Sequence, residues 1–383
     1  MNKVDFTKIR QCLISICALV FSVATPCLTM ASYSSSGIYL VGEYGYLQKL
    51  DGNLEVVATG KVPNLVRGCS IRDADISPDG ERLFLAVSSD NPLVVVRAAD
   101  LRVDESVLIT FPPLTKPWQT YLPFSIIATS PRYLYMTDES YSTAPNPFST
   151  VLVDLNAKTA KPIYGYSFMS KMQMQVSPSR EKMALYDGKL YFIDIPRGKV
   201  VDLISRKLIG KDRWVVWFNI NWDDNIAEFY TIPIRRGEKN LEKLCIDVKS
   251  KRIIYRGELE GKTGFGFYNA NSYRRVLTAT SSKIYIQDSK GTIQIFDRQT
   301  GKLLETLDYT LFGKAPGRPV LSYISPDERL LFYQKDDVKQ ISKGMGAQGI
   351  SSFFVIDTET RKTLKTLEFP QKVVAVLFSD EVQ

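Results

Sequence analysis

One unit recurs about every 40 residues along this chain: a turn, an apolar strand, a second strand that ends in Asp, and a further turn into another strand. The clearest copies begin at Ser77-Pro78-Asp79-Gly80 and at Ser325-Pro326-Asp327-Glu328. A single sheet of this size cannot bury both of its faces, so the sheets must pack against one another in series. A closed ring of such sheets is a β-propeller.

The number of units predicts how the ring is closed. Six units can be marked out, with the boundaries Arg72–Ile109, Phe124–Tyr166, Met172–Ile204, Val215–Leu259, Phe265–Tyr309 and Val320–Phe369. The remaining segments, Ile38–Pro63 and Val373–Phe378, supply about three strands and one strand. A sheet shared by both chain ends leaves no open edge. The sequence therefore predicts an all-β, seven-bladed β-propeller of four-stranded antiparallel blades, closed by pairing its N- and C-terminal strands. In the sixth unit the first strand is either Phe265–Asn269 or Val276–Thr280.

Residues 1–31 have the pattern of an export signal: basic residues, the apolar stretch Cys12–Val23, and small residues before a cleavage position at Ala31. The apolar stretch is too short for a permanent membrane span. Lipidation of Cys27 is the alternative, although Pro26 directly before it fits that reading poorly. We expect cleavage near Ala31, one propeller domain over residues 32–383, and a periplasmic or secreted protein with no membrane span after cleavage.

The formal net charge of +8 comes from 49 basic and 41 acidic residues that are interspersed along the chain. This distribution favours solubility and general anion attraction over nucleic-acid binding. Cleavage would leave two cysteines, Cys69 and Cys245, in units that should lie far apart in a ring. We therefore expect buried free thiols rather than a disulfide.

The chain contains no histidine. This excludes Ser-His-Asp triads, Cys-His nucleophile pairs, His-ligated metal sites and covalent c-type haem. Carboxylate pairs occur at Asp73/Asp75, Asp223/Asp224 and Asp336/Asp337, but nothing resembling a complete calcium loop surrounds them. We interpret them as structural, and an Asp that ends a third strand as a turn former. The sequence predicts no catalytic residue, no metal site and no cofactor.

Loop lengths distinguish the two faces of the predicted ring. The turns between strands one and two and between strands three and four are short, whereas the other connections are long and dissimilar: Thr110–Pro123, Asp138–Ser149, Ile232–Asn240, Phe312–Arg318 and Lys335–Ser351. Irregular insertions on one face of a rigid scaffold indicate a binding face. Aromatic and arginine side chains commonly anchor protein interfaces. The candidate partner- or ligand-binding residues in these loops are Trp118, Tyr121, Tyr141, Phe148, Arg235 and Arg236. Alternatively, the aromatic rings hold the loops onto the propeller.

The segments Lys283–Ile286 and Gly291–Lys302 resemble the YVTN-type propeller repeats of secreted bacterial proteins, and Ser77–Phe84 matches the turn and second strand of that repeat. In signal, length and blade count the chain also resembles the β subunit of quinohemoprotein amine dehydrogenase, a ring that helps house a quinone-bearing small subunit beside a haem subunit. Three functions stay open: a non-catalytic scaffold that binds another protein through its long-loop face, a subunit of an amine dehydrogenase-like complex, and a carboxylate-dependent enzyme or carbohydrate-binding propeller.

Overall fold

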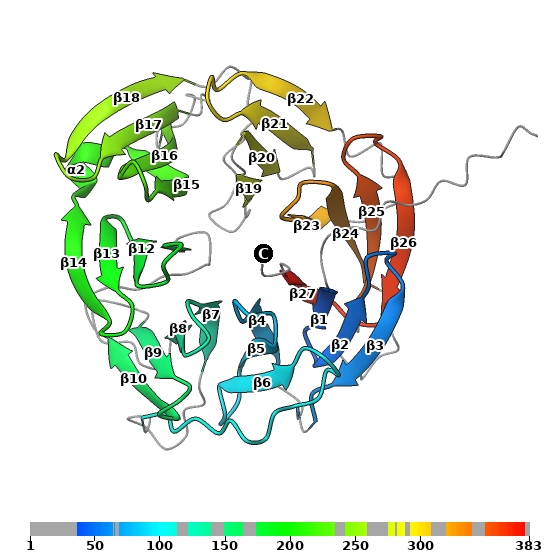
Figure 1. Cartoon of the computed structure of the whole chain (residues 1–383). Helices are drawn as coiled ribbons and strands as arrows, with labels where there is room; N and C mark the ends of the chain where they lie inside the picture. The colour runs from blue at the N-terminus through cyan, green and yellow to red at the C-terminus, as the bar shows by residue number, and fades with distance from the viewer. Residues whose placement is uncertain are drawn as a thin grey trace, which may run out of the picture. The chain divides into compact units, whose positions relative to one another are not determined.

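Seven antiparallel sheets are arranged in a ring in the computed structural model, each with one strand near the centre and one at the circumference (Figure 1). The predicted all-β, seven-bladed propeller is confirmed. The structure describes residues 37–63, 65, 69–112, 122–138, 149–163, 174–233, 242–258, 275–279, 282–287, 292–307, 319–338 and 349–379. These residues all belong to one compact unit, Ser34–Gln383.

The strands follow the chain order around the ring. The first three sheets contain β27 (Val373–Ser379), β1 (Gly37–Gly42), β2 (Tyr46–Leu50) and β3 (Val56–Lys61); β4 (Ile71–Ile76), β5 (Arg82–Val87) and β6 (Leu93–Arg97); and β7 (Pro123–Ala128), β8 (Tyr133–Asp138), β9 (Ser149–Asp154) and β10 (Thr159–Ile163). The next two contain β11 (Met174–Val176), β12 (Lys182–Tyr186), β13 (Leu190–Asp194) and β14 (Lys199–Ile204); and β15 (Arg213–Asn221), β16 (Ile226–Pro233), β17 (Glu242–Asp247) and β18 (Arg252–Glu258). The last two contain β19 (Arg275–Ala279), β20 (Lys283–Gln287), β21 (Ile293–Asp297) and β22 (Leu303–Leu307); and β23 (Pro319–Ile324), β24 (Leu330–Val338), β25 (Gly349–Asp357) and β26 (Thr363–Phe369). A helical turn, α2 (Arg206–Ile209), joins β14 to β15.

The two ends of the chain share the first sheet, as predicted. Strand β27 pairs antiparallel with β1 from Gly37↔Ser379 to Gly42↔Val373. The Ser379 hydroxyl also donates to the Gly37 carbonyl over 3.1 Å. Joining the first and last described strands in one sheet fastens the ring, because opening it here would break the β1–β27 ladder.

The second sheet differs from the others because it contains three strands among the described residues. After β6 the chain makes one bridge, Val96↔Val103, and then turns at Asp104, whose carboxylate accepts from the Ser106 backbone and hydroxyl. Farther on, Thr110 pairs with Thr159 at the outer strand of the next blade. The segment therefore leaves its own sheet early and adheres to its neighbour. In the sixth blade, the first strand is β19 (Arg275–Ala279), which corresponds to the second of the two predicted alternatives.

The turn chemistry explains where the strands stop. Asp297 ends β21, and its Oδ1 accepts from the Thr300 N–H at 2.6 Å, which lowers the pKa of the carboxyl. Equivalent Asp-capped turns follow Asp154, Asp247 and Asp357, so the predicted turn-forming role is confirmed. Between strands one and two, the Ser77 hydroxyl accepts from the Arg82 N–H across the turn at 2.9 Å.

The hydrophobic core lies between neighbouring sheets. One cluster joins Tyr39 and Leu47 of the first blade to Leu83 and Val96 of the second. Another joins Tyr285 of the sixth blade to Leu331 of the seventh. The second strand of the first sheet, β1, is buried throughout, whereas the outer strand β18 is mostly exposed. Each fully buried large apolar side chain contributes roughly 1.5–3 kcal/mol, so the blades are stabilised by packing face to face.

Candidate functional site

The six predicted binding residues lie outside the described residues: Trp118, Tyr121, Tyr141, Phe148, Arg235 and Arg236. Their role stays a prediction. The same is true of the export signal over residues 1–31 and of Cys27. In the part of the chain that the structure describes, no helix is long and apolar enough to span a membrane.

The first carboxylate pair joins two blades near the centre of the ring. Asp73 on β4 accepts from the Ser125 hydroxyl at 2.8 Å and from the Ile126 N–H at 3.0 Å, both on β7. Asp75 accepts from the Ala128 N–H at 2.8 Å. Because these oxygens bind main-chain and hydroxyl donors of the neighbouring blade, their role is structural.

The other two pairs do not form a site among the described side chains. Asp223 and Asp224 lie in the β15–β16 turn, where the Asn221 amide donates to Asp224 Oδ2 at 2.6 Å. Asp336 and Asp337 belong to β24, and their side chains are outside the description. Within the described residues, no group of Cys, Asp and Glu side chains is placed to hold a metal ion.

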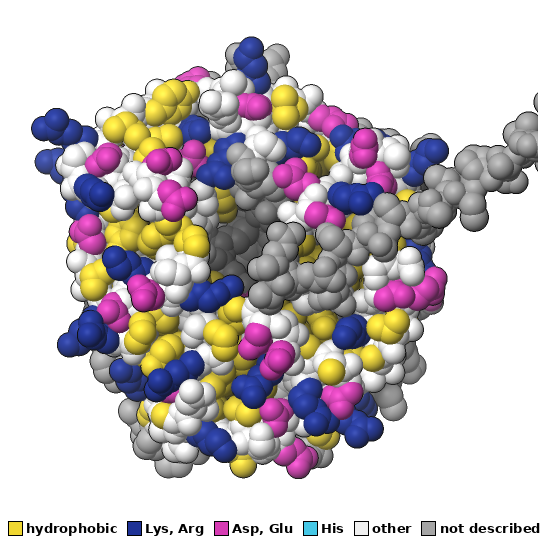
Figure 2. Space-filling view, viewed as in Figure 1, with side chains coloured by type: hydrophobic (Ala, Val, Ile, Leu, Met, Phe, Trp, Pro, Cys, Tyr) yellow, Lys and Arg dark blue, Asp and Glu magenta, His cyan; other side chains and the backbone are white. Residues whose placement is uncertain are grey.

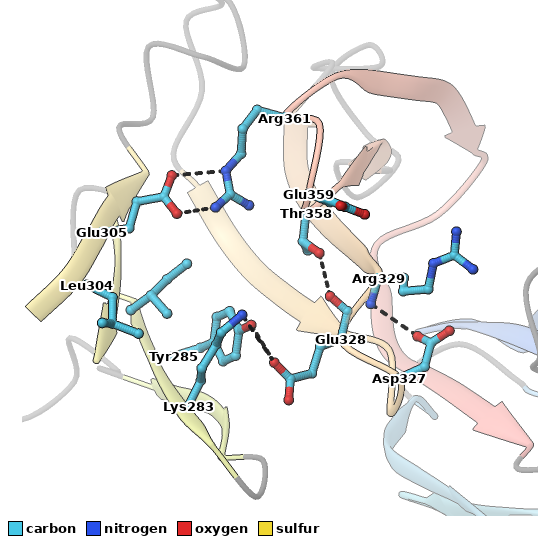
Figure 3. Close-up of a pocket in the computed structure, with 11 residues that line it drawn as sticks. Lys283, Tyr285, Leu304, Glu305, Asp327, Glu328, Arg329, Thr358, Glu359 and Arg361 are labelled. Carbon is cyan, nitrogen blue, oxygen red and sulfur yellow. Dashed lines mark hydrogen bonds and ion pairs between the residues drawn. The ribbon is translucent and has the colours of Figure 1, made fainter. Parts of the chain in front are cut away.

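A polar cavity of about 530 Å³ lies between the sixth and seventh blades and is a candidate site among the described residues (Figure 3). Its walls come from β20, β21 and β22 and from the two short turns of the seventh blade. The lining residues are Lys283, Tyr285, Ile295, Leu304, Glu305, Asp327, Glu328, Arg329, Thr358, Glu359 and Arg361. It therefore lies on the side of the ring formed by the short turns.

The charges in this cavity largely satisfy one another. Arg361 forms a two-point ion pair with Glu305, and its Nε lies 2.9 Å from Glu305 Oε1 (Figure 3). The Tyr285 hydroxyl donates to Glu328 Oε2 at 2.8 Å, and Lys283 Nζ lies 3.9 Å from the same oxygen. Each interaction crosses from the sixth blade to the seventh, so the cavity is also a junction that holds the two blades together.

The two hydroxyl groups of the cavity, on Tyr285 and Thr358, are both engaged in hydrogen bonds. Burial raises the pKa of Tyr285, and the bond to Glu328 raises it further, so the phenol stays protonated at neutral pH. The Thr358 hydroxyl already donates to the Glu328 carbonyl at 2.5 Å. The base that the Tyr285 hydroxyl meets is the Glu328 carboxylate, and the lining contains no imidazole or thiolate. This arrangement can hydrogen-bond a small polar group.

A second charged cluster lies between the fifth and sixth blades. Lys243 Nζ is 3.2 Å from Glu228 Oε1, and Arg298 Nη2 is 2.6 Å from Glu228 Oε2. The three side chains are only 9%, 13% and 17% exposed for Lys243, Glu228 and Arg298. One carboxylate thus pairs with two cations in a shielded place, and the cluster joins the fifth and sixth blades. On the face shown in Figure 2, acidic and basic side chains are interspersed around the ring.

The cavity residues were not predicted, although the repeat contained a signal for two of them. Glu328 occupies the place that Gly80 holds in the matching turn of the second blade, and its φ is 61°, a left-handed conformation that disfavours a side chain. Arg361 has φ 61° as well, at the turn position that Gly198 and Gly301 occupy elsewhere. A non-glycine residue at a glycine position indicates that its side chain contributes a contact.

No family model matches this sequence, and no curated protein matches it. Among solved structures, the chain is similar to hydrazine synthase from Kuenenia stuttgartiensis, with 16% identity, a TM-score of 0.49, and coverage of 76% of this chain and 77% of that chain. It is also similar to BamB from Moraxella catarrhalis, with 11% identity, a TM-score of 0.44, and coverage of 90% and 83%. At these levels neither likeness indicates what this chain binds or does.

Proposed function

We propose that this chain is a non-catalytic scaffold that binds another protein through its long-loop face. The observation that carries the proposal is the difference between two classes of connection. Those within the hairpins of strands one and two or three and four are short, such as 177–181 and 298–302. The remaining connections vary widely in length, from the short segment 187–189 to the long segment 98–122. Variable insertions on a uniform, rigid scaffold are typical of surfaces that bind partners.

The cavity between the sixth and seventh blades can hold a small polar group by hydrogen bonds, which fits a binding role. There Arg361 pairs with Glu305, and the Tyr285 hydroxyl donates to Glu328. We assign the partner contacts to Trp118, Tyr121, Tyr141, Phe148, Arg235 and Arg236, since aromatic rings and guanidinium groups contribute much of the binding energy at protein interfaces.

A tagged chain, recovered under native conditions from the cells that produce it, tests this proposal. We expect one partner in near-stoichiometric amount, lost when Trp118 and Tyr121 are both replaced by Ala. The control is Asp223→Ala, in an exposed turn of the opposite face, which should retain the partner. Binding through the loop face would be refuted if no stoichiometric partner were recovered. It would also be refuted if the partner were lost with Asp223→Ala but retained when Trp118 and Tyr121 are replaced.

A more specific form of the proposal makes the chain the β subunit of an amine dehydrogenase-like complex. It is supported by the YVTN-like repeats at Gly291–Lys302 and by the blade count. The native complex would then contain a haem subunit and a small quinone-bearing subunit. A haem absorbance band and a quinone-dependent redox stain on the recovered complex test this form, and their absence removes it without affecting the general scaffold proposal.

The same proposal places the mature chain in the periplasm or outside the cell. The support is the pattern of the first 31 residues, with its basic start, apolar middle and small residues before Ala31. N-terminal sequencing of the native protein should find its first residue close after Ala31. A chain that retains Met1, or that is acylated at Cys27, would contradict the proposed processing.

A further inference from the structure

The outer strands of the fourth and fifth blades form an apolar patch at the circumference of the ring. We call it the rim patch, defined by Val200, Val201 and Leu203 of β14 and Ile253, Ile254 and Tyr255 of β18. Their exposure ranges from 38% for Leu203 to 55% for Val201. In Figure 2, hydrophobic side chains reach the outline of the ring where Figure 1 shows β18. These six make up half of the large apolar residues that are exposed in the described part of the chain.

A repeated β-bulge explains part of this exposure. In the outer strands of five blades, the register slips by one residue opposite the third strand. In four of them the extra residue is a highly exposed aliphatic one: Val57, Val201, Ile254 and Leu304, at 54%, 55%, 54% and 53% exposure. Only on β14 and β18 are the extra residues accompanied by two further exposed apolar side chains on the same strand. The rim patch is therefore more than a by-product of blade geometry.

The two strands present one continuous surface. Lys251, in the turn that leads into β18, forms a 2.6 Å ion pair with Asp202 on β14. Arg256 on β18 donates to the carbonyl of Ile209, which ends α2 between the two blades, at 3.5 Å. These bonds tie the outer strands of the two blades to each other, so a ligand that covers β18 also meets β14.

The charge around the rim patch is positive. The exposed charged residues on β14, α2, β18 and the connection after α2 comprise the cations Lys199, Arg206, Lys207, Lys211, Arg252 and Arg256 and the anions Asp212 and Glu258. A second copy of the chain would bring the same excess of cations and be repelled. An acidic ligand with apolar side chains complements both the charge and the exposed aliphatic surface.

The backbone decides what form this ligand takes. Strands β14 and β18 are the terminal strands of their sheets, so their outward N–H and C=O groups have no strand partner within the sheet. An extended segment can satisfy such groups by adding a strand, with its alternate side chains on the neighbouring surface. We propose that the rim patch is a second docking surface, which binds an extended, acidic and apolar segment of a partner protein along β18 and beside β14.

The test uses a labelled, end-blocked peptide of about ten residues in which Glu and Val alternate, long enough to add one strand. Its binding to the full chain is followed by fluorescence anisotropy. We expect Ile254→Asp to weaken binding roughly tenfold or more and Arg252→Glu roughly fivefold, because the first removes apolar contact and both add repulsion. Raising the salt concentration should weaken binding further. Val57→Asp is the matched control at the same bulge position of β3, and it should bind like the unaltered chain.

Several outcomes overturn the proposal. The first is that a Lys/Val peptide binds as tightly as the Glu/Val peptide, and the second is that Val57→Asp weakens binding as much as Ile254→Asp does. The third is that the Glu/Val peptide does not bind, while the chain is retained on phosphatidylglycerol vesicles and Ile254→Asp abolishes that retention. A concentration-dependent dimer that Ile254→Asp dissociates would assign the patch to a second copy instead. The result is separable from the loop-face proposal, since Ile254→Asp should leave that complex intact and replacing Trp118 and Tyr121 should leave peptide binding unchanged.

Discussion

Because of the hydrogen bond between Tyr285 and Glu328, we expect Glu328→Gly to destabilise the native protein and to stabilise the Tyr285→Phe variant. Glu328 occupies the left-handed position of its turn, with φ 61°, where glycine is preferred. Its carboxylate accepts from the Tyr285 hydroxyl at 2.8 Å, and Tyr285 is only 2% exposed. Glu328→Gly therefore removes a backbone strain and a hydrogen-bond acceptor at the same time.

The two effects have different sizes. Releasing a side chain from the left-handed region gains about 1–2 kcal/mol, of which about 0.4–1 kcal/mol is lost because glycine makes the unfolded chain more flexible. Leaving the Tyr285 hydroxyl without its acceptor costs about 1–3 kcal/mol, since that hydroxyl is buried. We expect Glu328→Gly alone to lower the free energy of unfolding by about 1 kcal/mol. In the Tyr285→Phe background, where no hydroxyl needs an acceptor, the same change should raise it by about 0.5–1 kcal/mol.

Urea unfolding of the four proteins of this double-mutant cycle measures the effect, with tryptophan fluorescence and far-ultraviolet circular dichroism required to give coincident transitions. Arg180→Gly is the control, since Arg180 has φ 56° at the equivalent turn position of the fourth blade. Its effect should be the same with or without Tyr285→Phe. If Glu328→Gly also has the same effect in both backgrounds, the carboxylate does not hold the Tyr285 hydroxyl, and the reasoning is wrong.

The same tyrosine predicts a loss of stability in alkali. Burial and the bond to Glu328 raise the pKa of Tyr285 above its ordinary value of 10.0. The folded state therefore holds this proton more tightly than the unfolded chain does. That stabilisation is complete below pH 10 and is lost as the pH rises above 10 toward the folded-state pKa. Tyr285→Phe should make the decline in unfolding free energy above pH 10 shallower. An unchanged slope would show that this phenol does not contribute.

Two further predictions concern the fifth blade and its junction with the sixth. Glu228→Gln should lower the free energy of unfolding by about 3 kcal/mol, since it leaves Lys243 and Arg298 without a shared carboxylate; a change below about 1 kcal/mol in urea unfolding would contradict the proposed tie. Burial raises the pKa of the Cys245 thiol to about 11, whereas Cys69 is only partly buried. Iodoacetamide at pH 8 should label Cys69 first, as read by peptide mapping, and equal rates would show that Cys245 is accessible.

The features that depend on local sequence could be predicted. Asp297 and Asp357 mark strand ends because a side-chain carboxylate caps the turn that follows, and this needs only residues within the turn. Closure through Val373–Ser379 could be predicted by counting strands, because the N-terminal segment supplies only three of the four strands that a blade needs. Both free cysteines were expected, although Cys69 is half-buried rather than fully buried.

The features that depend on which blades face each other could not be predicted. Asp73 was expected to be structural, but its partner could not be named from the sequence, because its oxygen accepts from Ser125 of the next blade, 52 residues away. Likewise, Val201 and Ile254 stand out only once the bulge opposite the third strand is known, because a one-residue slip changes which side chains face outward. The binding site in the loops was predicted from the types of residue that the loops contain. It stays a prediction, because its residues, Trp118 among them, lie outside the described part of the chain.

The turns between strands three and four explain why docking is expected elsewhere on the ring. Lys158, Lys251 and Arg361 all adopt left-handed conformations in these turns, each at a cost of about 1–2 kcal/mol. Each side chain extends to the preceding blade: Lys158 to the Ser106 carbonyl at 2.9 Å, Lys251 to Asp202 at 2.6 Å, and Arg361 to Glu305. These three polar groups are thus already bound between blades. A partner that used these three side chains would have to break contacts between blades, whereas the outer strands can be covered without that loss.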